Sequence, residues 1–366
     1  MHGPPGTRDT AAGLSMSAMS RSAVSLPAKP RFRPVLPPLL MALALALPGV
    51  GQAAVLSDPA LQSLFAAGQA LELERAAQAR LSADANDLQG QMALALSSLE
   101  WGRPEALEPS LRQMQACVER QPDFAPCHYV LGSVLSVQAV RGGALKALSL
   151  NARIRQHLQR AFDLDPRSYE IRSALAQYYL AVPLLAGGSH SKARSLELDW
   201  RKANPEQARM LRIFIALGDE DWADAERELK TLRTGPDPRL AFDARVAYGQ
   251  LGRHFVKDHQ WDRARKLYEQ LMRDQPRQAT GPYLMARLAQ DQGRFEEAID
   301  WIQRARKLEG AELLPLDQRL GNAYEGLGDK VQARAAYERY LGGSHLHQRN
   351  EQEVRRSLAA LEGGAG

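Results

Sequence analysis

The sequence predicts an all-α protein, built as a solenoid of stacked antiparallel helix pairs with a capping helix at its C-terminal end. Small and apolar residues recur 34 and then 35 residues apart, and Gly and Pro recur with them at a fixed phase. No strand-like alternation accompanies this period. An interval of this length holds two helices and their turns, and such pairs bury their apolar faces by stacking on one another.

The repeat is clearest in the last third of the chain. Three sets of residues share this spacing: Leu251-Gly252, Met285-Ala286 and Leu320-Gly321; Ala264, Ala298 and Ala333; and Tyr268, Ile302 and Tyr337. Two helices approach each other closely only where their side chains are small. We therefore expect the Gly and Ala positions at the crossing of each pair, with the larger residues in the space beside them.

These residues also carry a resemblance to a known family. The order Leu-Gly, Tyr, Ala, Phe or Tyr, Ala and Pro is followed through LGRHF, DRARKLYEQL and DQP, and again through GNAYEGLGDKVQARAAYERYL. In these segments the chain resembles the tetratricopeptide repeat family. The resemblance implies a right-handed α-solenoid whose first helices line a concave face that holds a peptide. A continuous coiled coil is disfavoured, because Gly and Pro at a fixed phase would break its heptad seam.

The period divides the chain into three parts. Residues 1–54 form a leader, residues 55–345 a solenoid of about eight units, and residues 346–366 a capping helix with a flexible tail. The units loosen toward the N-terminus, where the first ones are degenerate. A terminal cap is expected because an open stack otherwise leaves the apolar face of its last unit uncovered.

The leader has the features of a secretory signal. Arg31 and Arg33 precede an apolar run over residues 35–47 (VLPPLLMALALAL), and a helix-breaking Pro-Gly and then Gly51-Gln52-Ala53 follow it. A basic segment, a short apolar stretch and small residues at a cleavage site define such signals. We expect a periplasmic or secreted protein that has no stable membrane insertion once the leader is cleaved. The alternative is an uncleaved N-terminal anchor.

The formal net charge of +5 is concentrated in this leader. The charged residues up to Ala54 contribute +4: Arg8, Asp9, Arg21, Lys29, Arg31 and Arg33. The rest of the chain therefore carries only +1 and lacks the basic surface that binding to nucleic-acid phosphates requires. No nucleic-acid partner is expected.

The two cysteines, Cys117 and Cys127, both follow the leader. In an oxidising compartment an even pair of this kind predicts a disulfide, which here would join the end of one helix to the start of the next. The alternative is two buried thiols that act as small apolar residues.

Two consecutive units are longer than the period. About ten extra residues lie at positions 137–146 (VQAVRGGALK), and about five lie within positions 182–189. Both insertions fall between the first and second helices, so we expect two loops on the same edge of the solenoid, and such loops often bind partners. Arg141, Pro183 and Leu185 are the candidate residues of this edge. The alternative is a neutral elaboration that seals a gap in helix packing.

Candidate partner-binding residues follow from the repeat frame. The positions of the first helices that point into the concave face include Tyr129, Gln177, Arg253, Lys257, Tyr283, Arg287 and Asn322. Aromatic and Arg side chains often dominate binding energy at protein interfaces. The alternative for each is an ordinary solvated position. Asn322 alone occupies a slot of the carboxylate clamp known in part of the family, so recognition of that kind is not expected.

Nothing in the sequence predicts catalysis. Phosphate-binding Gly-rich loops, Gly-x-Ser-x-Gly and His-Glu-x-x-His are missing from it, and His345 and His347 lack further metal ligands. We expect no enzyme activity, cofactor or metal. The sequence favours a non-catalytic scaffold of the cell envelope that binds a protein or peptide of unknown identity in its concave groove. The alternative is a self-associating structural component, or a membrane-anchored sorting component, that uses the inserted loops as its interface.

Overall fold

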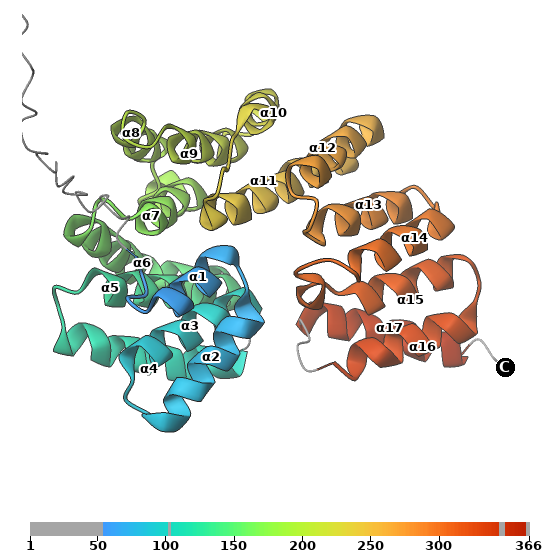
Figure 1. The fold of residues 1–366 in the computed structure, drawn as a ribbon, viewed down its shortest axis with the longest axis horizontal. Helices are drawn as coiled ribbons and strands as arrows, with labels where there is room; N and C mark the ends of the chain where they lie inside the picture. Colours follow the sequence, from blue (N-terminus) through green and yellow to red (C-terminus); the bar gives the residue numbers. More distant parts are fainter. Residues whose placement is uncertain (1–53, 102–103, 344–347, 364–366) are drawn as a thin grey trace, which may run out of the picture. The chain divides into compact units, whose positions relative to one another are not determined.

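The computed structural model describes residues 54–101, 104–343 and 348–363. Within these ranges it contains 17 α-helices and two 3-10 helices, and its only strand-like pairing is an isolated bridge between Gln278 and Glu309. The predicted all-α solenoid is therefore confirmed. Figure 1 shows the helices and their order along the chain.

The helices up to residue 200 are α1 Pro59–Ala67, α2 Ala70–Ala83, α3 Leu88–Trp101, α4 Pro104–Arg120, α5 Ala125–Arg141, α6 Gly143–Leu164, α7 Tyr169–Ala181, η1 Leu184–Ala186 and α8 His190–Trp200. Those that follow are α9 Pro205–Gly218, α10 Trp222–Thr231, α11 Pro238–Lys257, α12 Trp261–Asp274, α13 Thr280–Asp291, α14 Phe295–Ala305, η2 Ala311–Leu313, α15 Leu316–Gly326, α16 Lys330–Leu341 and α17 Gln348–Gly363. Consecutive helices pack as pairs, such as α5 with α6, α13 with α14 and α15 with α16.

Several helices begin where the sequence supplies a cap. The side chains of Ser168, Asp237 and Asp329 accept hydrogen bonds from the backbone N–H groups three residues further on. Proline opens α9 and α11, where its missing N–H costs no hydrogen bond. These local signals fix where the first helices α7, α9 and α11 and the second helix α16 start.

The predicted close crossings are present inside the helix pairs. A Cβ at Gly252 would overlap the ring of Tyr268, and one at Gly321 would overlap the ring of Tyr337. Ala264 and Ala333, on the second helices, are fully buried. In the α11–α12 and α15–α16 pairs an aromatic ring therefore lies directly on a glycine, with no space for a side chain between them.

The C-terminal helix covers the last pair. Val354 and Leu361 of α17 are buried against Tyr337 and Tyr340 of α16. Figure 1 shows α17 beside α16. This packing takes the outer face of the last pair out of water.

The first insertion is helical, which corrects the loop predicted for residues 137–146. α5 continues to Arg141 and α6 begins at Gly143, so most of the inserted residues lengthen these two helices. Gly143 has a φ of 76°, which a glycine adopts at no steric cost, and it makes the turn. The remaining inserted residues include Ala, Leu, Gln, Lys and Arg, which favour helices. The second insertion contains Pro183, which follows the end of α7, and the short helix η1.

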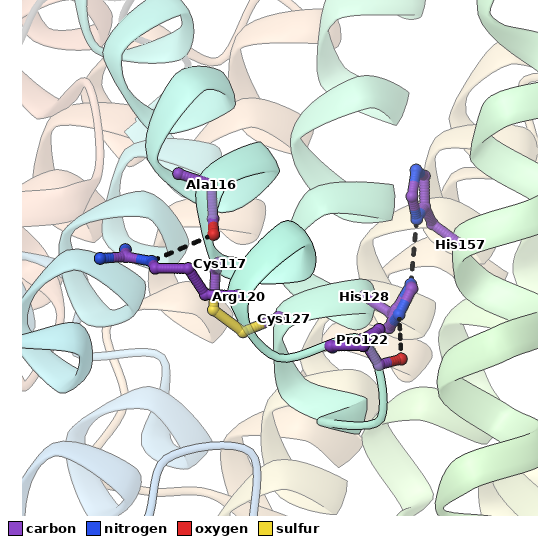
Figure 2. Close-up of a disulfide and its surroundings, with 7 residues drawn as sticks. All are labelled: Ala116, Cys117, Arg120, Pro122, Cys127, His128 and His157. Carbon is purple, nitrogen blue, oxygen red and sulfur yellow. Dashed lines mark hydrogen bonds between the residues drawn. A yellow bond between two sulfur atoms is a disulfide. The ribbon is translucent and has the colours of Figure 1, made fainter.

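A disulfide joins Cys117 of α4 to Cys127 of α5, and both residues are buried (Figure 2). Their Cα atoms are 5.8 Å apart, which lies within the usual range for a disulfide. The bond spans the turn that links the two helices and closes a short loop of the chain.

Next to the disulfide, two histidines form a hydrogen-bonded pair (Figure 2). Nε2 of His128 lies 3.0 Å from the carbonyl oxygen of Pro122, and its Nδ1 lies 3.0 Å from Nδ1 of His157. A carbonyl only accepts, so His128 donates from Nε2 and its Nδ1 accepts from His157. Burial, together with the charges of His128 and Arg153, lowers the pKa of His157 from 6.5 to about 4.

Removing the disulfide is expected to destabilise the fold. In the double variant Cys117→Ser/Cys127→Ser the unfolded chain regains the freedom of the loop, so the free energy of unfolding falls by about 3 kcal/mol. Urea denaturation of the oxidised protein, the reduced protein and the variant measures this. The reduced protein and the variant should share a lower midpoint, and three equal midpoints would contradict the prediction.

The histidine pair predicts a loss of stability in acid. Between pH 6.5 and about 4 the unfolded chain binds a proton at His157 that the folded chain does not, so the free energy of unfolding falls as the pH falls. The loss is complete below about pH 4. Thermal melts across this range should show a weaker pH dependence for His157→Gln than for the wild type. His259→Asn, at an exposed position, is the matched control and should retain the wild-type slope.

Candidate partner-binding groove

The first helices of successive pairs contact one another and form a shared surface, called here the first-helix surface: α3 with α5, and α7, α9, α11, α13 and α15 in succession. The resemblance to tetratricopeptide repeats predicts that partners bind on this side. Part of it is occupied by the chain itself.

Helix α1 lies on the first-helix surface. The backbone N–H of Ser57, just before α1, donates to Gln89 of α3 at 2.8 Å, and Gln62 donates to Glu170 of α7 at 3.2 Å. At the other end of α1, Arg245 of α11 donates to the carbonyl oxygen of Ala67 at 3.2 Å. The helix therefore spans helices from three different pairs, as a bound peptide would.

A buried polar cluster packs against α1. Tyr169 of α7 donates to Asp243 of α11 at 2.7 Å, and Asp243 also pairs with Arg239 at 3.0 Å. The guanidinium of Arg239 lies over the rings of Phe65 and Phe242. Burial raises the pKa of Asp243, while the charge of Arg239 opposes that rise. The cluster thus joins α1, α7 and α11 through groups that all have partners.

α1 ends at Gly68, and this glycine is required there. Its φ is 70°, and a Cβ at this position would overlap the ring of Phe242. The close approach brings the end of α1 against α11. At this point α1 ends and a groove begins.

The groove consists of two adjoining pockets. The larger, of about 440 Å³, lies between Gly68, helices α11 and α13, and the segment around η2. The smaller, of about 200 Å³, continues along α11 and α13. Arg253, Leu284 and Arg287 line both pockets, so they stand where the two meet.

The middle of the groove is cationic. Burial and the neighbouring charge of Arg287 lower the pKa of Arg253, which indicates that the two guanidinium groups face the same space. Burial raises the pKa of Tyr268 to about 12 although both arginines oppose it, so its hydroxyl stays protonated. Burial also raises the pKa of Asp291, the carboxylate that faces Arg287. Two like charges this close favour an anionic group between them.

The larger pocket also carries acidic side chains. Glu309 and Glu312 line the larger pocket, and Glu309 accepts from Gln278 at 3.0 Å. Phe242, Val246 and Leu314 supply apolar surface. The groove can therefore take an apolar side chain flanked by charges, with its strongest preference for a carboxylate near Arg253 and Arg287.

Four of the predicted residues meet in this groove: Arg253, Lys257, Tyr283 and Arg287. The other three do not. Asn322 accepts from the hydroxyl of Tyr337 at 2.9 Å, within its own helix pair. Gln177 lines a different pocket, at the inserted edge. Tyr129 corrects the prediction, since it is buried in α5, a helix that is buried on nearly every side between residues 127 and 135.

Sequence reasoning missed the contribution of Phe242, Arg245 and the end of α1 to the groove. The repeat frame describes contacts between neighbouring units only. Nothing in it signals that a helix at residue 59 packs on one that starts at residue 238.

The two insertions lie together at one edge. Val140, Ala144 and Leu148 share an apolar pocket of about 620 Å³ with Val182 and Pro183. Arg141, Pro183 and Leu185, the predicted edge residues, are all exposed.

One segment of the chain matches a known family of helical repeats. Residues 255–312 match the tetratricopeptide repeat family. This segment is therefore similar to tetratricopeptide repeats, a class of helical scaffold that is typically non-catalytic and generally mediates protein–protein interactions.

Solved structures give the fold alone. Yeast Tom70 matches over 79% of this chain and 58% of its own, with a TM-score of 0.52 and 14% identity. The chain thus spans little more than half the length of that protein. A tetratricopeptide repeat protein from Parabacteroides merdae matches 75% of this chain and 98% of its own, at 14% identity and a TM-score of 0.39. No curated protein sequence matches the chain.

Two further features bear on the chemistry of the described residues. They contain no cluster of three or more His, Cys, Asp or Glu side chains that would hold a metal ion. None of their helices is both long and apolar enough to cross a membrane. His345 and His347 lie outside the described residues, as does the leader.

Loosening α1 is expected to expose the first-helix surface locally. Phe65 is buried beneath Arg239, so Phe65→Ala removes about 3 kcal/mol of packing and raises amide hydrogen exchange in residues 57–67. Exchange in α13 to α16 should not change. Val331→Ala, at a 77% exposed site, is the control. A uniform rise across all helices would show instead that α1 unfolds only with the whole chain.

Proposed function

We propose that this protein is a non-catalytic scaffold of the bacterial cell envelope that holds a segment of a protein partner in the groove beyond α1. The proposal rests on one observation: Arg253 and Arg287 line both pockets where these meet, and Tyr283 lines the larger pocket beside them. Aromatic and Arg side chains in a partly desolvated hollow are the groups that dominate binding in protein interfaces.

The groove chemistry specifies the partner segment. A carboxylate between Arg253 and Arg287 relieves the repulsion of the two guanidinium groups and forms charge-assisted hydrogen bonds with both. An apolar side chain beside it would contact Phe242 and Leu284 in the larger pocket. The partner segment is therefore an extended or helical stretch with an Asp or Glu next to a large apolar residue.

The envelope location is supported by the leader and by the disulfide. A basic segment, a short apolar run and Gly51-Gln52-Ala53 are typical of an exported protein. Export also suits the disulfide between Cys117 and Cys127, since disulfides persist in oxidising compartments. Mass spectrometry of the N-terminus in fractionated cells tests this. We expect a periplasmic protein that begins at Ala54 or Val55, and an intact leader in the membrane fraction would contradict it.

Photo-cross-linking in living cells tests the groove. A photo-reactive residue at Tyr283 or Lys257 should give an adduct with one envelope protein, and one at Val331, an exposed site on α16, should not. Adding Arg253→Gln/Arg287→Gln should reduce the adduct from Tyr283 by at least about 30-fold, because truncating even one dominant arginine costs about 2 kcal/mol or more.

The matched control removes the same number of positive charges at sites outside the groove. Lys202→Gln/Lys307→Gln alters two exposed lysines that line neither pocket, and it should leave the adduct intact. Adducts that form only from Leu185, or only with a second copy of the chain, would move the interface to the inserted edge. Self-assembly would then be the better function.

A further inference from the structure

The inserted edge exposes apolar side chains that the groove does not use. Its members are Val140, Leu145, Leu148, Leu184 and Leu185, with exposed fractions of 83%, 85%, 69%, 80% and 102%. They are five of the nine large apolar side chains that are exposed in the described part of the chain. A gathering of this kind marks an interaction surface, whereas single exposed leucines are ordinary. These five residues are called the apolar edge below.

The apolar edge has two parts, one on the α5–α6 hairpin and one on η1, and hydrogen bonds hold them together. Asn151 of α6 donates to the carbonyl oxygen of Ala186 in η1, and Tyr178 of α7 donates to the side-chain oxygen of Asn151 at 2.8 Å. The loop folds back on itself through a bond from the N–H of Gly188 to the carbonyl oxygen of Pro183, at 3.1 Å. The leucines of η1 are therefore fixed beside the end of the α5–α6 hairpin.

The charged side chains carried by the segments of the apolar edge are all cationic. Residues 124–162 and 171–196 contain no Asp or Glu. Arg141, Lys146, Arg153 and Arg155 are exposed on the hairpin, and no carboxylate among the described residues forms an ion pair with them. On the neighbouring α4, Glu108 accepts from Gln138 and pairs with Arg112 at 3.6 Å. The edge thus presents exposed leucines together with exposed Arg and Lys side chains.

We propose that the apolar edge docks onto the surface of an anionic lipid bilayer. Leucines that project into the boundary between headgroups and acyl chains, with Lys and Arg on the phosphates, are the features of peripheral membrane binding. The pocket of about 620 Å³ behind the edge is lined mainly by apolar residues, among them Leu99, Val137 and Ile154, and it accommodates part of an acyl chain.

Two observations favour a bilayer over a protein. Leu145, Leu184 and Leu185 project into solvent and do not line the pocket, whereas a groove for a helix would have its apolar side chains in its walls. Two copies of the edge placed face to face would bring like charges together, because neither supplies a carboxylate.

Vesicle co-sedimentation tests the proposal. The purified full chain carries Leu43→Asp and Leu45→Asp throughout, so that the apolar run of the leader does not itself bind lipid. It should bind vesicles of phosphatidylcholine with phosphatidylglycerol more tightly than vesicles of phosphatidylcholine alone, and salt should weaken the binding. Leu145→Asp/Leu185→Asp should abolish it. Arg141→Gln/Lys146→Gln should weaken it roughly 25-fold, since each cation near the surface contributes about fivefold.

The controls match each change at a site away from the edge. Val331→Asp places the same charge at another exposed apolar residue, and Lys202→Gln/Lys307→Gln removes two exposed lysines elsewhere. Both should bind vesicles like the parent protein, and thermal melts should show that every variant is folded.

Three results would overturn the proposal. The first is equal binding to neutral and anionic vesicles, or binding that the edge variants leave unchanged. The second is the absence of vesicle binding together with a dimer that Leu145→Asp/Leu185→Asp dissociates, which would assign the edge to a second copy. The third is binding of a synthetic acidic amphipathic helix without any binding of vesicles, which would assign the edge to a protein partner.

Discussion

The ring of Tyr268 lies directly on Gly252, and the ring of Tyr337 lies in the same way on Gly321. This contact sets the distance between the two helices of a pair. A larger residue at either glycine would push the helices apart and open the seam along which the next pair stacks. Since a single pair cannot bury its apolar faces, each one depends on its neighbours for stability. The spacing within a pair therefore determines the position of every surface formed by several pairs, including the groove.

The first-helix surface is divided between a part that α1 covers and the groove that begins beyond it. α1 covers its α3 to α11 part through Gln62, Phe65 and the backbone around Ala67, all of which contact helices from other pairs. The groove begins where α1 stops at Gly68. Because Gly68 and Gln69 line the larger pocket, the position of α1 also shapes the groove proposed to bind a partner. The packing of α1 and the shape of the groove are therefore coupled at this boundary.

The fold was predictable because its signals are local and periodic. Gly252 and Ala286 sit one interval apart, so the residues that follow them, Arg253 and Arg287, were assigned to equivalent slots and do meet in the groove. Tyr129 was misassigned because its unit is degenerate and its helix is buried on nearly every side. The contacts of α1 were beyond the sequence pattern altogether. A repeat frame contains information about adjacent units, and the packing of α1 on α11 joins helices that no period relates.

The contact between α1 and α11 also has a consequence for the order of events during synthesis. Arg245 is 178 residues further along the chain than its acceptor Ala67. At ribosomal rates of about 5 to 20 residues per second, α1 is made roughly 10 to 35 seconds before the helix that completes its binding surface. Contacts at such a sequence separation form slowly, whereas neighbouring repeats pack as soon as they emerge. Of the described helices, α1 is made first and is therefore among the last to reach its final place, and its apolar face needs protection in the meantime.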